Sequence, residues 1–122
     1  MGNSFQYINL TNLSEICFGN EAYITDVLEC FRTVATSNLD LMLTNFVVGN
    51  YDEVRRVSHM IKITGAHIGA DLYLDVVARL EEAARLKDGV EMARQLGSLK
   101  RLTGKILDEI QIYLREEKSH QG

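Results

Sequence analysis

His59 and Lys62 are the residues of this sequence whose types and spacing are best suited to chemistry. On a helix, residues three positions apart lie about one turn from each other, so an ammonium group would stand beside an imidazole. A neutral imidazole nitrogen can attack a phosphoryl group, and a nearby cation can neutralise the phosphoryl oxygens during transfer. Because this spacing is common on helices, phosphoryl chemistry needs support from further residues.

Four charged residues around this pair could provide that support. Arg55 and Arg56 precede the histidine and place local positive charge on a chain of formal net charge -4, which would attract an acidic partner site. If the outward ring nitrogen is the nucleophile, the inner nitrogen needs an acceptor that fixes the tautomer. Glu81, on the next antiparallel helix, is the candidate acceptor, and Arg85, one turn further along, would add charge at the rim.

The other histidines offer weaker alternatives. His67 follows His59 by eight residues and lies about 80° round the helix, so we interpret it as a polar helper and not as a second nucleophile. This separation differs from the one-turn pairing of metal-binding helices, so we expect no metal site. A metal-dependent hydrolase remains a rival, supported only by scattered histidines and carboxylates. ATP hydrolysis is not expected, because the sequence has no glycine-rich phosphate loop.

The elements that must position these residues are helices. Proline is absent, and apolar residues recur every three or four positions between glycine and asparagine punctuation. We expect an all-α, antiparallel up-and-down four-helix bundle, with a short additional N-terminal helix as a lid on one end. The expected helices cover about 11–18, 20–48, 51–68, 71–87 and 92–116. The expected caps and breaks are Thr11 or Asn12, Asn20, Gly69, Asp71 and Gly89.

The third expected helix directs His59 outward. Its apolar residues fall on one side at 100° per residue, whereas His59 and Lys62 fall on the opposite side. The core side consists of Val54, Val57, Ile61, Thr64 and Ile68.

Composition limits the classes of function. A chain of 122 residues fits one domain, which we place at 1–122 with an ordered core of about 8–116. The net charge of -4 argues against nucleic-acid binding, and no apolar run is long enough for a membrane span. The N-terminus lacks the features of a signal peptide, and we expect Cys17 and Cys30 to be buried thiols, so we expect a cytoplasmic protein.

The stretch Ser58 to Ala70, SHMIKITGAHIGA, resembles the signature of histidine-containing phosphotransfer (HPt) domains of two-component phosphorelays, in which lysine and glycine follow the histidine by three and ten residues. The likeness in order and spacing of elements covers most of the chain. It implies that His59 is phosphorylated, that Lys62 supports the phosphoryl oxygens and that Glu81 holds the imidazole. The implied partners are response-regulator receiver domains, including those of hybrid sensor kinases, which supply an aspartate and Mg²⁺. The chain itself would need no cofactor and would have no autonomous kinase activity.

One residue departs from the HPt pattern. The family usually has a small residue directly after the lysine, whereas this chain has Ile63, and Gly65 lies on a different face. Ile63 could slow transfer or mark a phosphorylation-incompetent module that only binds a receiver or another protein. We favour a third interpretation, in which Ile63 joins an apolar docking patch around the histidine. The supporting or docking residues are Arg55, Arg56, Ile63, Ala66, His67, Gly69 and Arg85.

Overall fold

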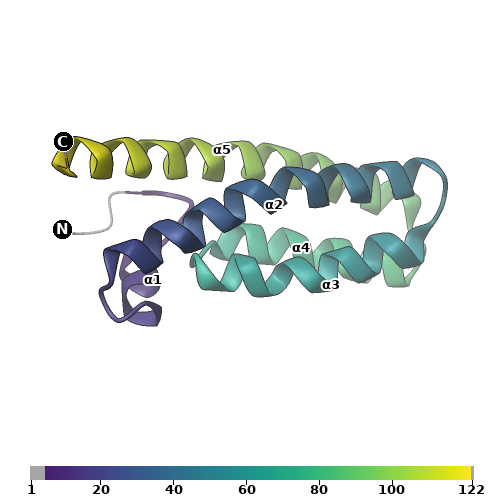
Figure 1. Cartoon of the computed structure of the whole chain (residues 1–122). Coiled ribbons are helices and arrows are strands. Elements are labelled where there is room, and N and C mark those ends of the chain that lie inside the picture. The colour runs from purple at the N-terminus through teal and green to yellow at the C-terminus, as the bar shows by residue number, and fades with distance from the viewer. Residues whose placement is uncertain (1–4, 122) are drawn as a thin grey trace.

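The apolar residues that recur every three or four positions form α-helices in the computed structural model, which describes residues 5–121 and the side chains of residues 5–117 (Figure 1). The described part of the chain contains five helices and no strand, so the all-α prediction is confirmed. The helices are α1 (Leu10–Ile16), α2 (Glu21–Val47), α3 (Tyr51–His67), α4 (Asp71–Arg85) and α5 (Gly89–Gln121).

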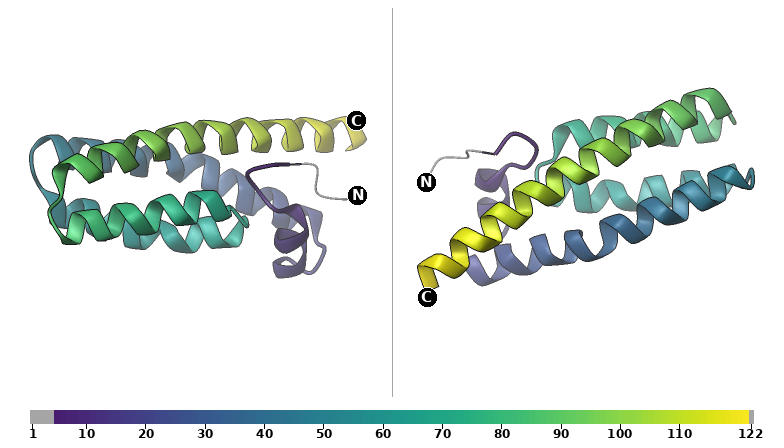
Figure 2. Two further views of the ribbon diagram at one scale, coloured as in Figure 1. Left: turned by 180° about the vertical axis from the view of Figure 1, so that it is seen from behind. Right: turned by 90° about the horizontal axis from the view of Figure 1, so that it is seen from above.

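Helices α2 to α5 form the predicted up-and-down bundle. Each packs against the next along the chain, and α5 closes the arrangement against α2. Figures 1 and 2 show that α2 and α5 extend beyond α3 and α4 at one end of the bundle, the end where the C-terminus lies. The short helix α1 packs against α2 and α3 at that end, so the predicted lid is also confirmed.

A carboxylate of α5 anchors the segment that leads into α1. Glu109 accepts hydrogen bonds from the backbone N–H groups of Gln6, Tyr7 and Ile8, at 2.7, 2.9 and 3.0 Å. Ile8 is buried, so this anchor also brings an apolar side chain into the core.

The buried side of α3 turns His59 toward solvent. The predicted core residues of this helix are buried, except that Thr64 is only half-buried. Ser58 and Gly65 are buried as well, which the apolar pattern did not predict. The Ser58 hydroxyl donates to the Val54 carbonyl at 2.7 Å, so its burial leaves no unpaired polar group. His59 lies about 100° round the helix from Ser58, outside the buried side, and is exposed.

Gly65 allows α3 and α4 to approach each other closely. A Cβ atom at this position would lie 2.8 Å from Cδ1 of Tyr73 on α4, which is closer than van der Waals contact permits. Tyr73 is buried and packs edge-on against Phe31 of α2, with ring centroids 5.6 Å apart. The small residue at position 65 therefore sets the spacing of the two helices that carry His59 and Glu81.

Two of the predicted N-terminal caps are wrong. The cap of α1 is Asn9, not Thr11 or Asn12, because its side-chain oxygen accepts the N–H of Asn12 at 3.0 Å while its own N–H donates to the carbonyl of Ile68. Asn20 caps α2 as predicted.

Asp71 is the first residue of α4 and not its cap. The cap position is Ala70, which is buried and makes no side-chain capping bond. The Asp71 carboxylate instead places negative charge in the first turn, which favours a helix N-terminus without a cap bond.

The connection between α4 and α5 also differs from expectation. Gly89 does not end α4: this helix ends at Arg85, the chain turns through Lys87 at φ +56°, and Gly89 begins α5. Asp88 accepts the N–H of Glu91 at 3.1 Å, so a cap starts α5 earlier than position 92.

The other end of α5 lies beyond the predicted end near position 116. The backbone remains helical to Gln121, and Tyr113 and Leu114 are still buried in the last turns for which side chains are described. The backbone of residues 118–121 is thus part of α5, past the expected helix end near position 116. The side chains of those residues, including His120, and residues 1–4 lie outside the described part.

The two cysteines have different surroundings. Cys17 is buried as expected, whereas Cys30 is exposed, which contradicts the expectation. Cys30 lies one position off the buried stripe that contains Leu28 and Phe31, so the turn of α2 carries it outward. No helix in residues 5–121 combines the length and apolar character that crossing a membrane requires.

Candidate functional site

The strongest candidate site is built where α3 and α4 run side by side. His59 lies on α3 with 76% of its side chain exposed, and Glu81 lies on α4 with 20% exposed. Antiparallel packing brings these residues together although they are separated by 22 positions in the chain. The sequence prediction placed the same two residues on facing helices, and the structure has them in contact.

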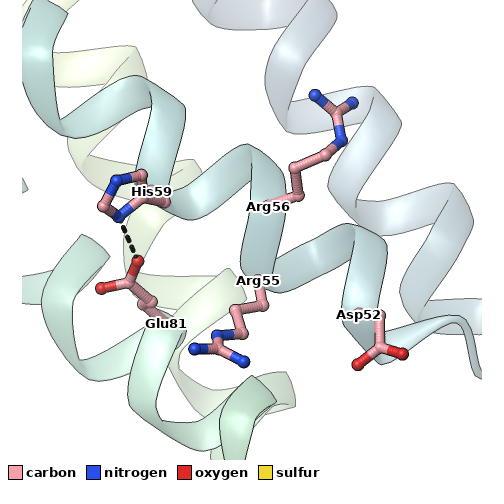
Figure 3. Close-up of a pocket in the computed structure, with 5 residues that line it drawn as sticks. All are labelled: Asp52, Arg55, Arg56, His59 and Glu81. Carbon is pink, nitrogen blue, oxygen red and sulfur yellow. Dashed lines mark hydrogen bonds and ion pairs between the residues drawn. The ribbon is translucent and has the colours of Figure 1, made fainter.

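Glu81 binds two partners of α3, one on each carboxylate oxygen. Nδ1 of His59 lies 2.8 Å from Oε2, as the dashed line in Figure 3 marks. The ammonium of Lys62 donates to Oε1. The three residues expected to carry the chemistry therefore form one connected group. Lys62 was expected beside the imidazole, and its hydrogen bond is to the Glu81 carboxylate.

The Glu81 carboxylate is held in its charged form. The hydrogen bond from Lys62 is the largest cause that lowers the pKa of Glu81 below its ordinary value of 4.5, and the contact with His59 lowers it further. Burial acts in the opposite direction but does not reverse the shift. A charged carboxylate can only accept hydrogen bonds, so His59 must carry its proton on Nδ1 when the ring is neutral.

This tautomer leaves Nε2 of His59 with its lone pair directed outward. Among the residues that the structure describes, none hydrogen bonds to Nε2, and the ring edge that carries it is turned away from Glu81 in Figure 3. An exposed imidazole nitrogen with a free lone pair can act as a nucleophile toward a group brought by a partner.

The two arginines before the histidine occupy different positions. Arg55 lines an open hollow of about 440 Å³ together with His59 and Glu81. No ion pair of Arg55 is present in the described part of the chain. Arg56 also lines the hollow, but it pairs with Glu53 and extends on the other side of α3 in Figure 3.

Two further charged residues complete the surroundings. Arg85, expected at the rim, pairs with Glu82, with Nε and Oε2 2.9 Å apart, and does not line the hollow. Asp52 does line it and was not predicted as a site residue. The available signal was its spacing, because seven residues before His59 is about two helical turns on the same face.

The comparisons with known proteins give one structural match. No protein-family model matches the sequence, and no curated protein matches it. A similar solved structure is the crystal structure of histidine-containing phosphotransfer protein B (HptB) from Pseudomonas aeruginosa PAO1. The TM-score is 0.85, the match covers 93% of this chain and 98% of the other, and the sequence identity is 17%. The chain shares the fold of HptB. At this identity the likeness shows the fold alone.

An exposed apolar surface borders the histidine. Ile63 is 62% exposed, and Met60 and His67 lie beside it along α3. His67 also lines a hollow of about 330 Å³ formed with the corner between α1 and α2. We call this surface the corner patch; it consists of Ile16, Phe18, Tyr23, Met60, Ile63 and His67.

The remaining predicted residues lie at the edge of this surface. Ala66 is exposed on α3. His67 lines the hollow at the corner between α1 and α2 and does not contact the carboxylate of Glu81. Gly69 has φ +64°, which ends α3 as predicted, and a Cβ atom there would lie 2.6 Å from Cβ of Asn9. Gly69 is therefore required for the attachment of α1 and is not a contact of the imidazole.

The residues that the structure describes form no cluster of metal ligands. Nowhere within them do three or more histidine, cysteine, aspartate or glutamate side chains gather as they would to hold a metal ion. The rival interpretation as a metal-dependent hydrolase thus has no specific observation in its favour.

Proposed function

We propose that this chain is a phosphorelay carrier, which accepts a phosphoryl group on Nε2 of His59 from a receiver-domain aspartate and passes it to another receiver. One observation carries the proposal: an exposed imidazole is oriented by Glu81 through Nδ1, so that Nε2 is free and faces outward. The fold shared with HptB, whose name describes a phosphotransfer protein, is consistent with this role.

The proposed transfer needs no cofactor bound to this chain. The lone pair of Nε2 attacks the phosphorus of the aspartyl phosphate, the P–N bond forms, and the bond between phosphorus and the aspartyl carboxyl oxygen breaks. The aspartate leaves as a carboxylate. The ring retains its Nδ1 proton and becomes a phosphorylated imidazolium, whose positive charge faces Glu81. The reverse sequence on a second receiver returns neutral His59.

The chain supplies position and charge, and the receiver supplies the remaining chemistry. The receiver's aspartate is the phosphoryl donor or acceptor, and its Mg²⁺ would neutralise the phosphoryl oxygens. Arg55 lines the hollow beside His59 and adds positive charge toward an acidic partner. We therefore infer a cytoplasmic transfer intermediate with no autonomous kinase activity and no cofactor of its own.

The corner patch is the surface on which we place the receiver. It borders the histidine, and Phe18 is 95% exposed. Phe18 also has φ +55°, a conformation that costs a bulky L-residue about 1–2 kcal/mol. Lys87 has the same conformation, φ +56°, at the end of α4, so this backbone conformation belongs to the helix end. The exposure of the Phe18 ring beside other apolar residues is what favours contact with a partner.

Incubation with a phosphorylated receiver tests the proposal. A carrier should acquire a label that is labile in acid and stable in base, as phosphohistidine is. His59→Gln should abolish this label. His67→Gln, which removes the other histidine of α3, should still become labelled, although more slowly because His67 belongs to the corner patch. A wild-type chain that stays unlabelled with each of several phosphorylated receivers would contradict the proposal.

A second candidate is a module that binds a receiver without being phosphorylated. The observation in its favour is Ile63, which projects from α3 one turn after His59 and is 62% exposed. A branched side chain there could hold a receiver too far from Nε2. Stable receiver binding with no label on His59 would support this candidate over the carrier.

A further inference from the structure

Lys62 is already engaged before any phosphoryl group arrives. Its ammonium donates to Oε1 of Glu81, while Oε2 of the same carboxylate contacts Nδ1 of His59. The ammonium and the imidazole thus lie on the two oxygens of one carboxylate. Because Lys62 lies three residues after His59 on α3, its flexible side chain is also placed to approach a group bound to the imidazole.

A phosphoryl group on Nε2 would compete for this ammonium. It carries a charge of about -2, whereas the Glu81 carboxylate carries -1, so the electrostatic attraction for a lysine at similar distance is greater. The Lys62 side chain is 36% exposed and is not enclosed by the core. Arg56 is paired with Glu53 and Arg85 with Glu82. Arg55 lines the same hollow without an ion pair in the described part of the chain, so it is the cation whose effect the test must separate from that of Lys62.

We propose that Lys62 exchanges partners during transfer, binding Glu81 in the unphosphorylated chain and the phosphoryl oxygens in the phosphorylated chain. The inference rests on the proposed function, because it describes the same site in its loaded state. The exchange pairs charges in both states: Lys62 with Glu81 before transfer, then Lys62 with the phosphoryl group and Glu81 with the imidazolium.

The exchange has a consequence for onward transfer. Once Lys62 leaves, the Glu81 carboxylate interacts with the Nδ1 proton of the charged ring alone and keeps that proton in place. A protonated ring is the better leaving group, because the electron pair of the broken P–N bond returns to a neutral imidazole and not to an imidazolate. Glu81 is therefore a positioning residue that keeps the P–N bond reactive, and Lys62 restrains the phosphoryl group until a receiver displaces it.

The test uses chemical phosphorylation, which requires no receiver. The full chain is phosphorylated on His59 with phosphoramidate, and the carboxyl ¹³C resonance of Glu81 is recorded at pH 8 in both states. Lys62→Met should shift this resonance in the unphosphorylated chain and leave it unchanged in the phosphorylated chain. Arg85→Met, which removes a paired cation from the same helix as Glu81, should shift it in neither state.

The lifetime of the phosphorylated chain gives a second readout. Lys62→Met should shorten the half-life of the label several-fold. Glu81→Gln should lengthen it several-fold, and in this variant the ¹⁵N shifts of the phosphorylated ring should report loss of the Nδ1 proton at neutral pH. Circular dichroism should show the same helix content for each variant, which separates these effects from unfolding.

Three outcomes would overturn the exchange. The first is a Lys62→Met shift of the Glu81 resonance that is equal in both states, because Lys62 would then remain on Glu81. The second is a label whose half-life depends on Arg55→Met and not on Lys62→Met. The third is a failure of phosphoramidate to label His59, which would overturn the proposed function as well. If the exchange is observed but no receiver donates its phosphoryl group, the relay proposal alone falls.

Discussion

Nδ1 of His59 on α3 and Oε2 of Glu81 on α4 lie 2.8 Å apart, so the orientation of the exposed imidazole is set by a neighbouring helix. A side chain that is 76% exposed would otherwise sample several rotamers. The contact fixes both the tautomer and the direction of Nε2. The reactivity of the histidine should thus depend on how α3 and α4 pack, and not on α3 alone.

Glu81→Gln should slow phosphoryl acceptance without unfolding the chain. The amide can still accept the Nδ1–H bond, but it cannot balance the positive charge that develops on the ring. The difference between a charged and a neutral hydrogen bond predicts about a tenfold loss of rate, which corresponds to about 1.4 kcal/mol. The measurement is the initial rate of label transfer from a phosphorylated receiver. Glu82→Gln, on the adjacent position, is the control, and an equal loss there would contradict a specific role for Glu81.

The contribution of Glu81 to stability should depend on pH. Its contacts with Lys62 and His59 lower its pKa in the folded chain below 4.5, so the stabilisation is fully present above that value and is lost as the pH falls through the lowered pKa. We expect wild type to exceed Glu81→Gln by about 0.5–1 kcal/mol in free energy of unfolding at pH 7, since the pair is partly exposed. Urea unfolding at pH 7 and at pH 3 measures the difference, which should narrow at pH 3. A difference that is constant with pH would indicate a packing effect.

Phe18→Ala should weaken receiver binding and leave the fold intact. The ring is 95% exposed, so its removal takes nothing from the core, whereas an aromatic anchor in an interface contributes about 1–2 kcal/mol, or tenfold or more in Kd. Val90→Ala removes a side chain that is 74% exposed at the start of α5, outside the corner patch, and is the control. Titration calorimetry with a receiver measures both Kd values, and equal effects would show that the corner patch is not the docking surface.

Ile63→Ala separates the two interpretations of that isoleucine. If Ile63 is part of the docking patch, its truncation should raise Kd about as much as that of Phe18 and should not accelerate transfer. If it obstructs the approach of the receiver, truncation should accelerate transfer with unchanged Kd. Alanine is preferred to glycine here, because it preserves the helix.

The sequence predicted the helices and the orientation of His59 because both follow from periodicity. Amphipathic spacing identifies the buried side of α3, and the opposite side then carries the histidine. Glu81 was predictable for the same reason, since it adjoins Leu80, a core residue of the facing helix. These predictions rest on many residues at once, so a single exception such as Thr64 does not alter them.

Features that depend on single atoms were not predictable in the same way. The cap of α1 is Asn9 because the chain there is also bonded to Ile68, a contact that no local pattern reveals. The bond between Lys62 and Glu81 depends on the distance between two helices, which Gly65 and Tyr73 set. Sequence spacing places Lys62 on the same face as His59, but it does not show that its ammonium binds Glu81.

Gly65→Ala should destabilise the chain, whereas Gly104→Ala should stabilise it. The new Cβ at position 65 would lie 2.8 Å from Cδ1 of Tyr73, so the buried Tyr73 ring, and α4 with it, must move away from α3, at a cost of about 1–3 kcal/mol. At position 104 of α5 the Cβ meets nothing within 4 Å, so alanine should gain about 0.5–1 kcal/mol through helix propensity. Urea unfolding measures both changes. Because a wider spacing of α3 and α4 also lengthens the contact between His59 and Glu81, folded Gly65→Ala should accept label more slowly than Gly104→Ala. Equal labelling rates would contradict the dependence of the site on this helix pair.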